Sequence, residues 1–192
     1  MSEDATRART DLVWPDEAGE DRAGPRGAEP LETPSPQVLR AAFGRYATGV
    51  TLVTCCDTAG LRSGLTVNSF SSLSLEPPLV LWSLRLRSAN LEAFTAARCF
   101  VVNVLKQDHA ELSRWFATAP AGQRFDQGQW RAGLGGAPVL QDASAAFECE
   151  LRGWHDEGDH RLFIGRVRRV SQSEGAPLLY LQGAYRSIAQ AG

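Results

Sequence analysis

Lysine is almost absent from this sequence, and so are long apolar runs. Lys106 is the one lysine among 20 basic residues, so nearly all of the positive charge is arginine. No apolar run reaches the roughly 18 residues that a membrane-spanning helix requires, and the N-terminus lacks the basic-then-apolar order of a signal peptide. We therefore expect a cytoplasmic protein without a membrane partner.

Cysteine is also scarce, and its spacing is not that of a metal site. The 4 cysteines include no C-x-x-C pair, and the adjacent Cys55 and Cys56 would point to opposite faces of a strand. No His-x-x-x-His pattern is present either. We expect no bound metal, and we expect reduced thiols of the kind found in the cytosol.

Acidic residues gather in the first 35 positions. This segment holds nine acidic residues against four arginines, with few apolar residues beyond Leu12-Val13-Trp14. It cannot bury enough surface to offset the entropy lost on ordering, so we predict a disordered tail over residues 1–35 and one domain over residues 36–192. Trp14 leaves open a partner-docking tail as the alternative. The domain carries a weak and scattered positive charge, which does not favour a nucleic-acid partner.

The first elements of the domain are expected to be a helix and a hairpin. Apolar residues at helical spacing follow Pro36, Ser35 is placed to cap the helix, and the helix is expected to end near Thr48-Gly49. The apolar runs over residues 50–56 and 61–67 flank a turn, which predicts an antiparallel hairpin.

Later segments predict short strands with two helices among them. The nearly continuous apolar run over residues 79–86 predicts a strand buried on both faces, and the Gly-, Pro- and Gln-rich residues 119–140 predict a long excursion. Without regular strand-helix-strand alternation, the pattern predicts a mainly β, largely antiparallel barrel with short helices. The other expected elements are strands over 99–105, 145–154, 160–170 and 177–185, a short helix after Ser88 and a helix over about 108–117.

The stretch from Gly64 to Pro78 is unusually rich in hydrogen-bonding side chains. These side chains are Thr66, Asn68, Ser69, Ser71, Ser72 and Ser74. Buried hydroxyls and amides without partners are costly, so the stretch must either face water or surround a polar planar ligand. The alternative is that these side chains only satisfy an irregular turn.

An anion site is predicted one strand later. Ser88 is a suitable N-cap for the helix that follows, and Arg87 beside it would add a guanidinium to the backbone N–H groups of the helix start. The alternative is an ordinary capped helix with a solvated arginine. No G-x-G-x-x-G motif follows a strand and no nucleophile elbow is present, which argues against a Rossmann dehydrogenase and an α/β-hydrolase.

Five motifs in a fixed order resemble the flavin reductase family. They are Phe43-Gly-x-Tyr-x-Thr-Gly-Val-Thr-Leu-Val53, Thr66-Val-Asn-Ser-Phe-Ser-Ser-Leu-Ser-Leu-x-Pro-Pro-Leu-Val80, Phe100-Val-Val-Asn-Val-Leu105, Gly158-Asp-His160 and Pro177-Leu-Leu-Tyr-x-x-Gly-x-Tyr185. The similarity spans about residues 38–188. It implies an FMN-binding split β-barrel, antiparallel and of Greek-key type, that forms a homodimer and uses NADH or NADPH to reduce FMN or FAD.

The resemblance also implies where the flavin would bind. The ring is expected at Thr66, Val67, Asn68, Ser69 and Ser83, the phosphate at Arg87 and Ser88, and further contacts at Thr48 and Gly49. A flavin ring has an edge of carbonyls and ring nitrogens that requires donors and acceptors in one plane, which this polar stretch could supply.

Among the three histidines, His160 is the candidate for the nicotinamide side. The resemblance places it beside the nicotinamide, as the catalytic or contacting residue, with Tyr185 and Arg186 closing the same pocket. Arg161 departs from the apolar residue that the family pattern has directly after this histidine. His109 is expected to be solvated, and His155 has no evident partner in the sequence.

We predict an NAD(P)H-dependent flavin reductase that transfers hydride from nicotinamide C4 to flavin N5 and supplies reduced flavin to a partner monooxygenase. Two alternatives remain open. One is a non-catalytic flavin- or haem-binding split-barrel protein, and the other is an oxidase that keeps its flavin and reduces a bound organic substrate. The sequence does not choose FMN over FAD, or NADH over NADPH.

Overall fold

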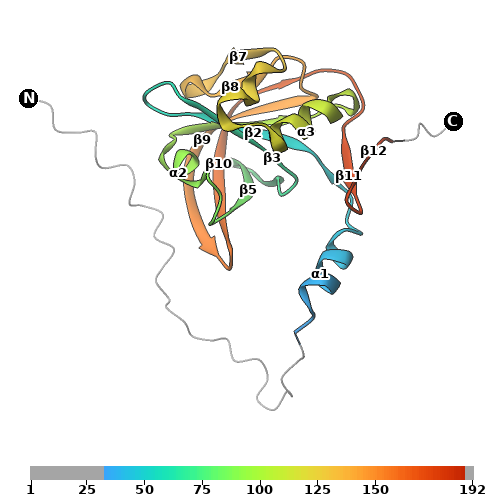
Figure 1. Ribbon diagram of the computed structural model, residues 1–192. Coiled ribbons are helices and arrows are strands. Elements are labelled where there is room, and N and C mark those ends of the chain that lie inside the picture. Colours follow the sequence, from blue (N-terminus) through green and yellow to red (C-terminus); the bar gives the residue numbers. More distant parts are fainter. Residues whose placement is uncertain (1–32, 189–192) are drawn as a thin grey trace, which may run out of the picture. The chain divides into compact units, whose positions relative to one another are not determined.

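The computed structural model describes residues 33–188. The chain divides after Phe43 into two compact units, the first of which contains helix α1 (Pro36–Phe43). The second contains every other described element (Figure 1). The tail predicted over residues 1–35 lies outside the described residues except for positions 33–35, so its disorder and the boundary at residue 36 stay predictions.

Helix α1 begins where its capping residues predict. The Val38 N–H donates to Ser35 Oγ at 3.4 Å, so Ser35 caps the helix and Pro36 is its first residue. The prediction that the helix continues to Thr48-Gly49 is wrong. These two residues form strand β1 (Thr48–Gly49), which pairs with Tyr180 and Leu179 and so takes their backbone out of any helix.

The second unit is built on one seven-stranded antiparallel sheet. Its strands, in spatial order, are β3 (Arg62–Val67), β2 (Thr51–Cys56), β6 (Cys99–Val104), β9 (Ala145–Glu157), β10 (His160–Gln172), β5 (Pro78–Arg85) and β4 (Ser71–Leu75). The two predicted hairpins, β2 with β3 and β9 with β10, are confirmed.

The chain connection between the two edge strands makes this sheet curl. Strands β3 and β4 lie at opposite edges, yet only residues 68–70 join them. Seven flat strands would hold the edges roughly 29 Å apart, whereas the connection reaches about 14 Å from Val67 to Ser71 at full extension. The sheet therefore closes into a barrel with a seam between β3 and β4, and the predicted mainly β, antiparallel barrel is confirmed.

Smaller elements surround the barrel. Strands β1, β11 (Leu179–Leu181) and β12 (Ala184–Arg186) form a three-stranded sheet, and β7 (Trp130–Ala132) pairs with β8 (Pro138–Leu140). The helices are α2 (Leu91–Ala96), α3 (Ala110–Thr118) and the 3-10 turns η1 (Gln107–His109), η2 (Ala121–Asp126) and η3 (Leu134–Gly136). The single last strand predicted over 177–185 is thus two strands, and the predicted excursion over 119–140 contains a hairpin and two 3-10 turns.

An aromatic cluster fills the barrel. Trp82 stacks on Phe163 with ring centroids 4.6 Å apart, and the edges of Phe94 and Phe100 pack against it. Gly165 leaves the room that Phe100 needs, since a Cβ at this position would lie 2.3 Å from the Phe100 ring. This packing fixes β5 and β10 side by side, and both strands contribute to the site described below.

The prediction that residues 79–86 form a strand buried on both faces is wrong. Along β5 the residues alternate, with Val80, Trp82 and Leu84 buried and Leu79, Leu81 and Ser83 partly exposed. The residues on the more exposed face of β5 are not part of the buried core, and Ser83 among them lines a cavity.

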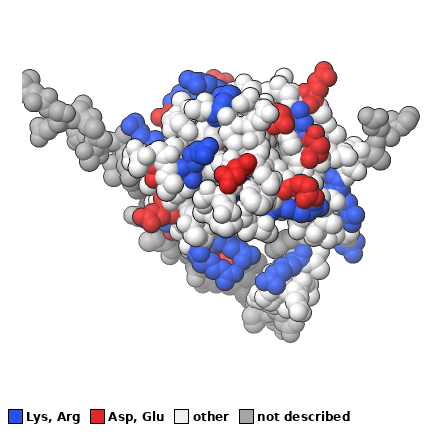
Figure 2. Space-filling model, turned by 45° about the horizontal axis from the view of Figure 1, so that its top comes forward, with Lys and Arg blue, Asp and Glu red and all other residues white. Residues whose placement is uncertain are grey.

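The surface of the described residues carries both signs of charge. On the face shown in Figure 2, acidic and basic side chains are interspersed over the second unit. Within residues 33–188, no helix is long and apolar enough to cross a membrane.

Candidate functional site

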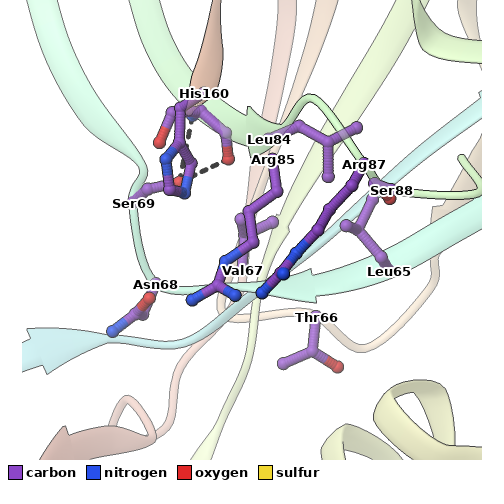
Figure 3. A pocket seen from close by; sticks show the side chains of 11 residues that line it. Leu65, Thr66, Val67, Asn68, Ser69, Leu84, Arg85, Arg87, Ser88 and His160 are labelled. Carbon is purple, nitrogen blue, oxygen red and sulfur yellow. Dashed lines mark hydrogen bonds between the residues drawn. The ribbon is translucent and has the colours of Figure 1, made fainter. Parts of the chain in front are cut away.

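A cavity of about 520 Å³ opens where the seam of the barrel meets the ends of β5 and β10. Its lining residues come from three segments and are shown in Figure 3: Leu65, Thr66, Val67, Asn68, Ser69, Ser83, Leu84, Arg85, Arg87, Ser88 and His160. Eight of these residues are among those predicted as site residues from the sequence. The structure therefore brings together residues that lie far apart in the chain, and the volume is typical of a small-molecule site.

The polar stretch predicted from the sequence is held in place by its own hydroxyl groups. Ser69 Oγ donates to the Ser83 carbonyl and accepts from the Ser83 N–H, both at 3.0 Å, which ties the connection between β3 and β4 to β5. Thr66 Oγ1 donates to the Ser113 carbonyl of α3 at 2.9 Å, so toward a ligand this hydroxyl can only accept. The side chain of Asn68 is exposed and has both functions available for a ligand.

Two arginines make the cavity electropositive. Arg85 and Arg87 both extend from the end of β5 toward β3 (Figure 3), and no acidic residue is among the described residues that line the cavity. Strand β5 ends at Arg85, and a turn closed by the bond from the Ser88 N–H to the Arg85 carbonyl brings Arg87 to the same cavity. A cavity with two guanidinium groups favours an anionic ligand such as a phosphate.

The helix start adds less to this anion site than the sequence predicts. Helix α2 begins at Leu91, three residues after Ser88, and is only six residues long. Ser88 Oγ accepts from the Asn90 N–H at 3.2 Å, so Ser88 stabilises the turn before the helix and does not cap it. The positive charge at the cavity is therefore that of the arginine side chains.

His160 enters the cavity from a hairpin tip. Strands β9 and β10 are joined by Gly158 and Asp159, and Gly158 takes a φ of 56°, which a two-residue turn of this hand requires. Asp159 Oδ1 lies 2.6 Å from His160 Nδ1, and this bond lowers the pKa of the Asp159 carboxyl. With Nδ1 held by Asp159, the Nε2 edge of the ring is the one available to a ligand.

Tyr185 reaches the cavity only through α3. Its hydroxyl lies 2.7 Å from Ser113 Oγ, and Ser113 in turn accepts the bond from Thr66 through its carbonyl. Tyr185, Arg186, Thr48 and Gly49 all belong to the three-stranded sheet and are not among the residues that line the cavity. Their predicted roles at the site stay predictions. Thr48 Oγ1 is buried, and no partner for it lies within the described residues.

The sequence motifs did not single out Leu65, Leu84 and Arg85, which also line the cavity. For Arg85 a signal was available, since it stands two residues after Ser83 in the same strand and therefore on the same face. Leu65 and Leu84 carried no such signal, because apolar residues in strands are usually core.

The other two histidines differ from the expectation. His109, expected to be solvated, is buried, and its ring accepts from the Lys106 N–H and lies 3.0 Å from Asp142 Oδ2. These contacts tie the start of α3 to the loop before β9, a structural role. His155 Nε2 lies 3.4 Å from a carboxylate oxygen of Glu157, and both side chains are exposed.

The cysteines offer no reactive group. Burial raises the pKa of the Cys55 and Cys149 thiols to about 12, so both stay protonated at neutral pH. Within residues 33–188 all four cysteines are unpaired, and no cluster of three or more possible ligands could hold a metal ion.

Comparison with known proteins identifies the family. A family model described as "Flavin reductase like domain" matches residues 43–189. The chain belongs to this family. The match covers the barrel and the cavity, including all the residues that line it.

Three relatives within the flavin reductase family are similar over most of the chain. "Probable flavin reductase" of Rhizobium meliloti is 43% identical over 157 residues, which are 82% of this chain and 50% of that protein. "FMN reductase (NADH) SmoA" of Agrobacterium fabrum is 42% identical over 147 residues, 77% of this chain and 83% of that protein. "Flavin-dependent trigonelline monooxygenase, reductase component" of Acinetobacter baylyi is 40% identical over 147 residues, 77% of this chain and 47% of that protein. The chain thus spans about half the length of two of these relatives.

A solved structure of the same family has the same fold. The NADH:FAD oxidoreductase of Streptomyces globisporus, in complex with NAD and FAD fragments, is 34% identical and superposes with a TM-score of 0.77. The superposition covers 84% of this chain and 98% of that one.

The residues of the cavity fit a flavin. Apolar Leu65, Val67 and Leu84 can contact the faces of a planar ring, while Thr66 and Asn68 offer an acceptor and an amide to its polar edge. The guanidinium groups of Arg85 and Arg87 complement a phosphate on the flavin side chain.

Proposed function

We propose that this chain is an NAD(P)H:flavin oxidoreductase that binds FMN or FAD in the cavity at the barrel seam and reduces it with NADH or NADPH. The observation that carries the proposal is the cavity itself, in which an apolar floor, a hydroxyl- and amide-bearing edge and two arginines converge. Membership in the flavin reductase family supports it.

The residues of β3, the following connection and β5 would hold the flavin. Ser69, fixed by two bonds to Ser83, keeps the backbone of residues 67–69 in one conformation, so this edge is organised before the ligand arrives. Arg87 and Arg85 would bind the phosphate. Flavin, when bound, supplies the acceptor for the hydride of the nicotinamide, and the protein's part is to orient the two partners.

His160 would form the nicotinamide side. Its Nδ1 is held by Asp159, so the ring is oriented and presents Nε2 toward the cavity. Hydride transfer needs no proton donor at this residue, and the proposed role of His160 is to position the nicotinamide.

We extend the proposal to two partners. The Acinetobacter baylyi relative is the reductase component of a monooxygenase, which supports a monooxygenase as recipient of the reduced flavin. A homodimer is supported by strand β4, an edge strand whose Leu75 is 93% exposed and Leu73 is 46% exposed, because a second copy could cover this apolar edge. A cytoplasmic location is supported by the unpaired cysteines.

The function is tested by mixing the purified protein with each nicotinamide and each flavin. We expect NADH or NADPH oxidation far above the uncatalysed rate with FMN or FAD, and the preferred pair identifies the substrates. Oxidation at the background rate in all four combinations would contradict the reductase and leave a flavin- or haem-binding protein. Oxidation only after addition of an organic acceptor would favour the oxidase alternative.

A further inference from the structure

Arg161 follows His160 in β10, and its side chain contacts three residues on two elements. Its Nε and Nη2 donate to the two carboxylate oxygens of Asp156 at 2.5 and 2.7 Å, and its Nη1 donates to Thr95 Oγ1 at 2.9 Å. The guanidinium also lies over the Trp154 ring, 3.6 Å from its centroid. The side chain is 13% exposed, so this charged group is largely enclosed by its partners.

The contacts link the hairpin tip to α2. Asp156 and Trp154 belong to β9, whereas Thr95 belongs to α2, the helix that follows the Arg87-Ser88 turn. Thr95 Oγ1 donates to the Leu91 carbonyl at 2.7 Å and accepts from Arg161. The Thr95 hydroxyl proton is therefore directed at Leu91, and an oxygen lone pair is left to accept from the guanidinium. Through Arg161, the strand that carries His160 is attached to the helix beside the phosphate end of the cavity.

Backbone pairs with β9 and β5 hold β10 as far as His160, the first residue of the strand. Residues 154–159 are all exposed, and His160 itself is only partly covered. The Leu86 N–H donates to the Asp159 carbonyl at 3.0 Å, and His160 pairs with Arg85 at the end of β5. Adjacent residues of a strand point to opposite faces, so Arg161 holds the strand from the side away from the cavity while His160 faces it.

We propose that Arg161 is a positioning residue for the nicotinamide side of the site: its clamp on Asp156, Thr95 and Trp154 fixes the hairpin tip so that His160 stands at the cavity. This inference rests on the proposed function. A planar guanidinium can make the two-pronged bond to Asp156, the third bond to Thr95 and the stacking on Trp154 at once.

The test is the variant Arg161→Met, which keeps the length of the side chain but removes the guanidinium. We expect KM for the preferred nicotinamide to rise about tenfold, since a small displacement of a positioning residue has effects of this size or larger. The Kd for FMN, measured by fluorescence quenching, should change less than twofold because the flavin side does not include Arg161. Amide hydrogen exchange of residues 155–160, measured without ligands, should accelerate about tenfold.

The matched control is Arg168→Met. Arg168 lies on the same strand and forms an ion pair with Glu150 on β9, away from the cavity. The Arg168→Met variant should leave the KM for the nicotinamide, the Kd for FMN and the hydrogen exchange of the hairpin tip unchanged. An Arg161→Met variant with wild-type KM and exchange, or one that loses FMN affinity as much as nicotinamide affinity, would overturn the inference.

Thr95→Val gives a second and milder test. It removes one of the three partners without touching the hairpin, so KM should rise a few-fold, and combining it with Arg161→Met should add little. Fully additive effects would contradict a shared clamp, and the variant keeps the inference testable if Arg161→Met does not fold. If wild-type protein itself oxidises no NADH or NADPH, the proposed function fails, whereas hydrogen exchange still reports on the clamp.

Discussion

The wall of the cavity formed by β3 and β5 is tied into the barrel, whereas the wall that carries His160 is the tip of a hairpin (Figure 1). On the first wall Val67 and Leu84 are part of the aromatic core cluster, and Ser69 bonds to β5 twice. On the second wall, residues 154–159 are exposed, and the side-chain bonds of Arg161 add to the backbone pairs that β10 makes with β9 and β5.

This difference accords with two ligands that behave differently. A fixed wall loses little conformational entropy when a ligand binds, so it suits the flavin ring, whose orientation decides the reaction. The exposed wall that carries His160, called the rim below, suits a ligand that must enter and leave in each turnover, because elements with few buried contacts move more easily. We therefore propose that flavin binds to the fixed wall and nicotinamide binds at the rim.

The largest effect is expected from Arg87→Ala on the flavin wall. Removing a charged bond to phosphate costs roughly 1.5–3 kcal/mol, so the Kd for FMN should rise about 10- to 100-fold. Binding of riboflavin, which lacks the phosphate, should be unchanged. Both are measured by titration with fluorescence detection, with the exposed Arg152→Ala as the control. Equal losses for FMN and riboflavin would show that Arg87 does not bind the phosphate.

A smaller effect is expected from Ser69→Ala, which removes the two bonds between the β3–β4 connection and β5. The Ser83 N–H loses its partner, so the free energy of unfolding should fall by about 1–2 kcal/mol, and FMN should bind a few-fold more weakly. Urea unfolding checks the first value. Ser71→Ala is the control, because its hydroxyl is exposed and bonds only to the neighbouring Ser72 carbonyl. If the two variants were equally stable, the bonds between Ser69 and Ser83 would not hold the β3–β4 connection in place.

The smallest effect is a pH dependence on the rim. The hydrogen bond from Arg161 lowers the pKa of the Asp156 carboxyl in the folded protein. The pair therefore stabilises the fold at pH values above the unfolded pKa of about 3.9, and this contribution is lost as pH falls through the lowered folded pKa. Water screens this partly exposed carboxylate, so the contribution should be small.

Urea unfolding of wild type and Asp156→Asn checks this dependence. The variant should be less stable at neutral pH, and the difference should disappear at strongly acidic pH. A difference that grew as the pH fell would have the wrong sign for a carboxylate with a lowered pKa.

Much of the fixed wall could be predicted from the sequence, because its signals are local. The polar stretch from Thr66 to Ser69 and the pair Arg87-Ser88 each stand out within one short segment, at the end of β3 and just after β5. The flavin ring is expected at Thr66 and Ser69, and the hydroxyls of both residues bond to protein carbonyls. Such partners come from β5 and α3, distant in sequence, and no local pattern indicates them.

The rim was less predictable for the same reason. His160 is indicated by the family motif, but the bond from the neighbouring Arg161 goes to Thr95, 66 residues away from Arg161. His109 was expected in solvent because a helix N-terminus is usually exposed, and only the packing of Asp142 beside it shows otherwise. The error at the end of α1 came from the pairing of β1 with β11, which joins residues about 130 positions apart. The last strand is divided because the chain turns at residues 182–183 and β12 pairs back on β11.

The division between the two walls is tested most directly by His160→Ala, measured for FMN binding and for nicotinamide turnover in the same preparation. The account predicts an FMN Kd within twofold of wild type together with a fall of about tenfold or more in kcat/KM for the preferred nicotinamide. A variant that turned over NADH at the wild-type rate, or that lost FMN binding along with turnover, would contradict it.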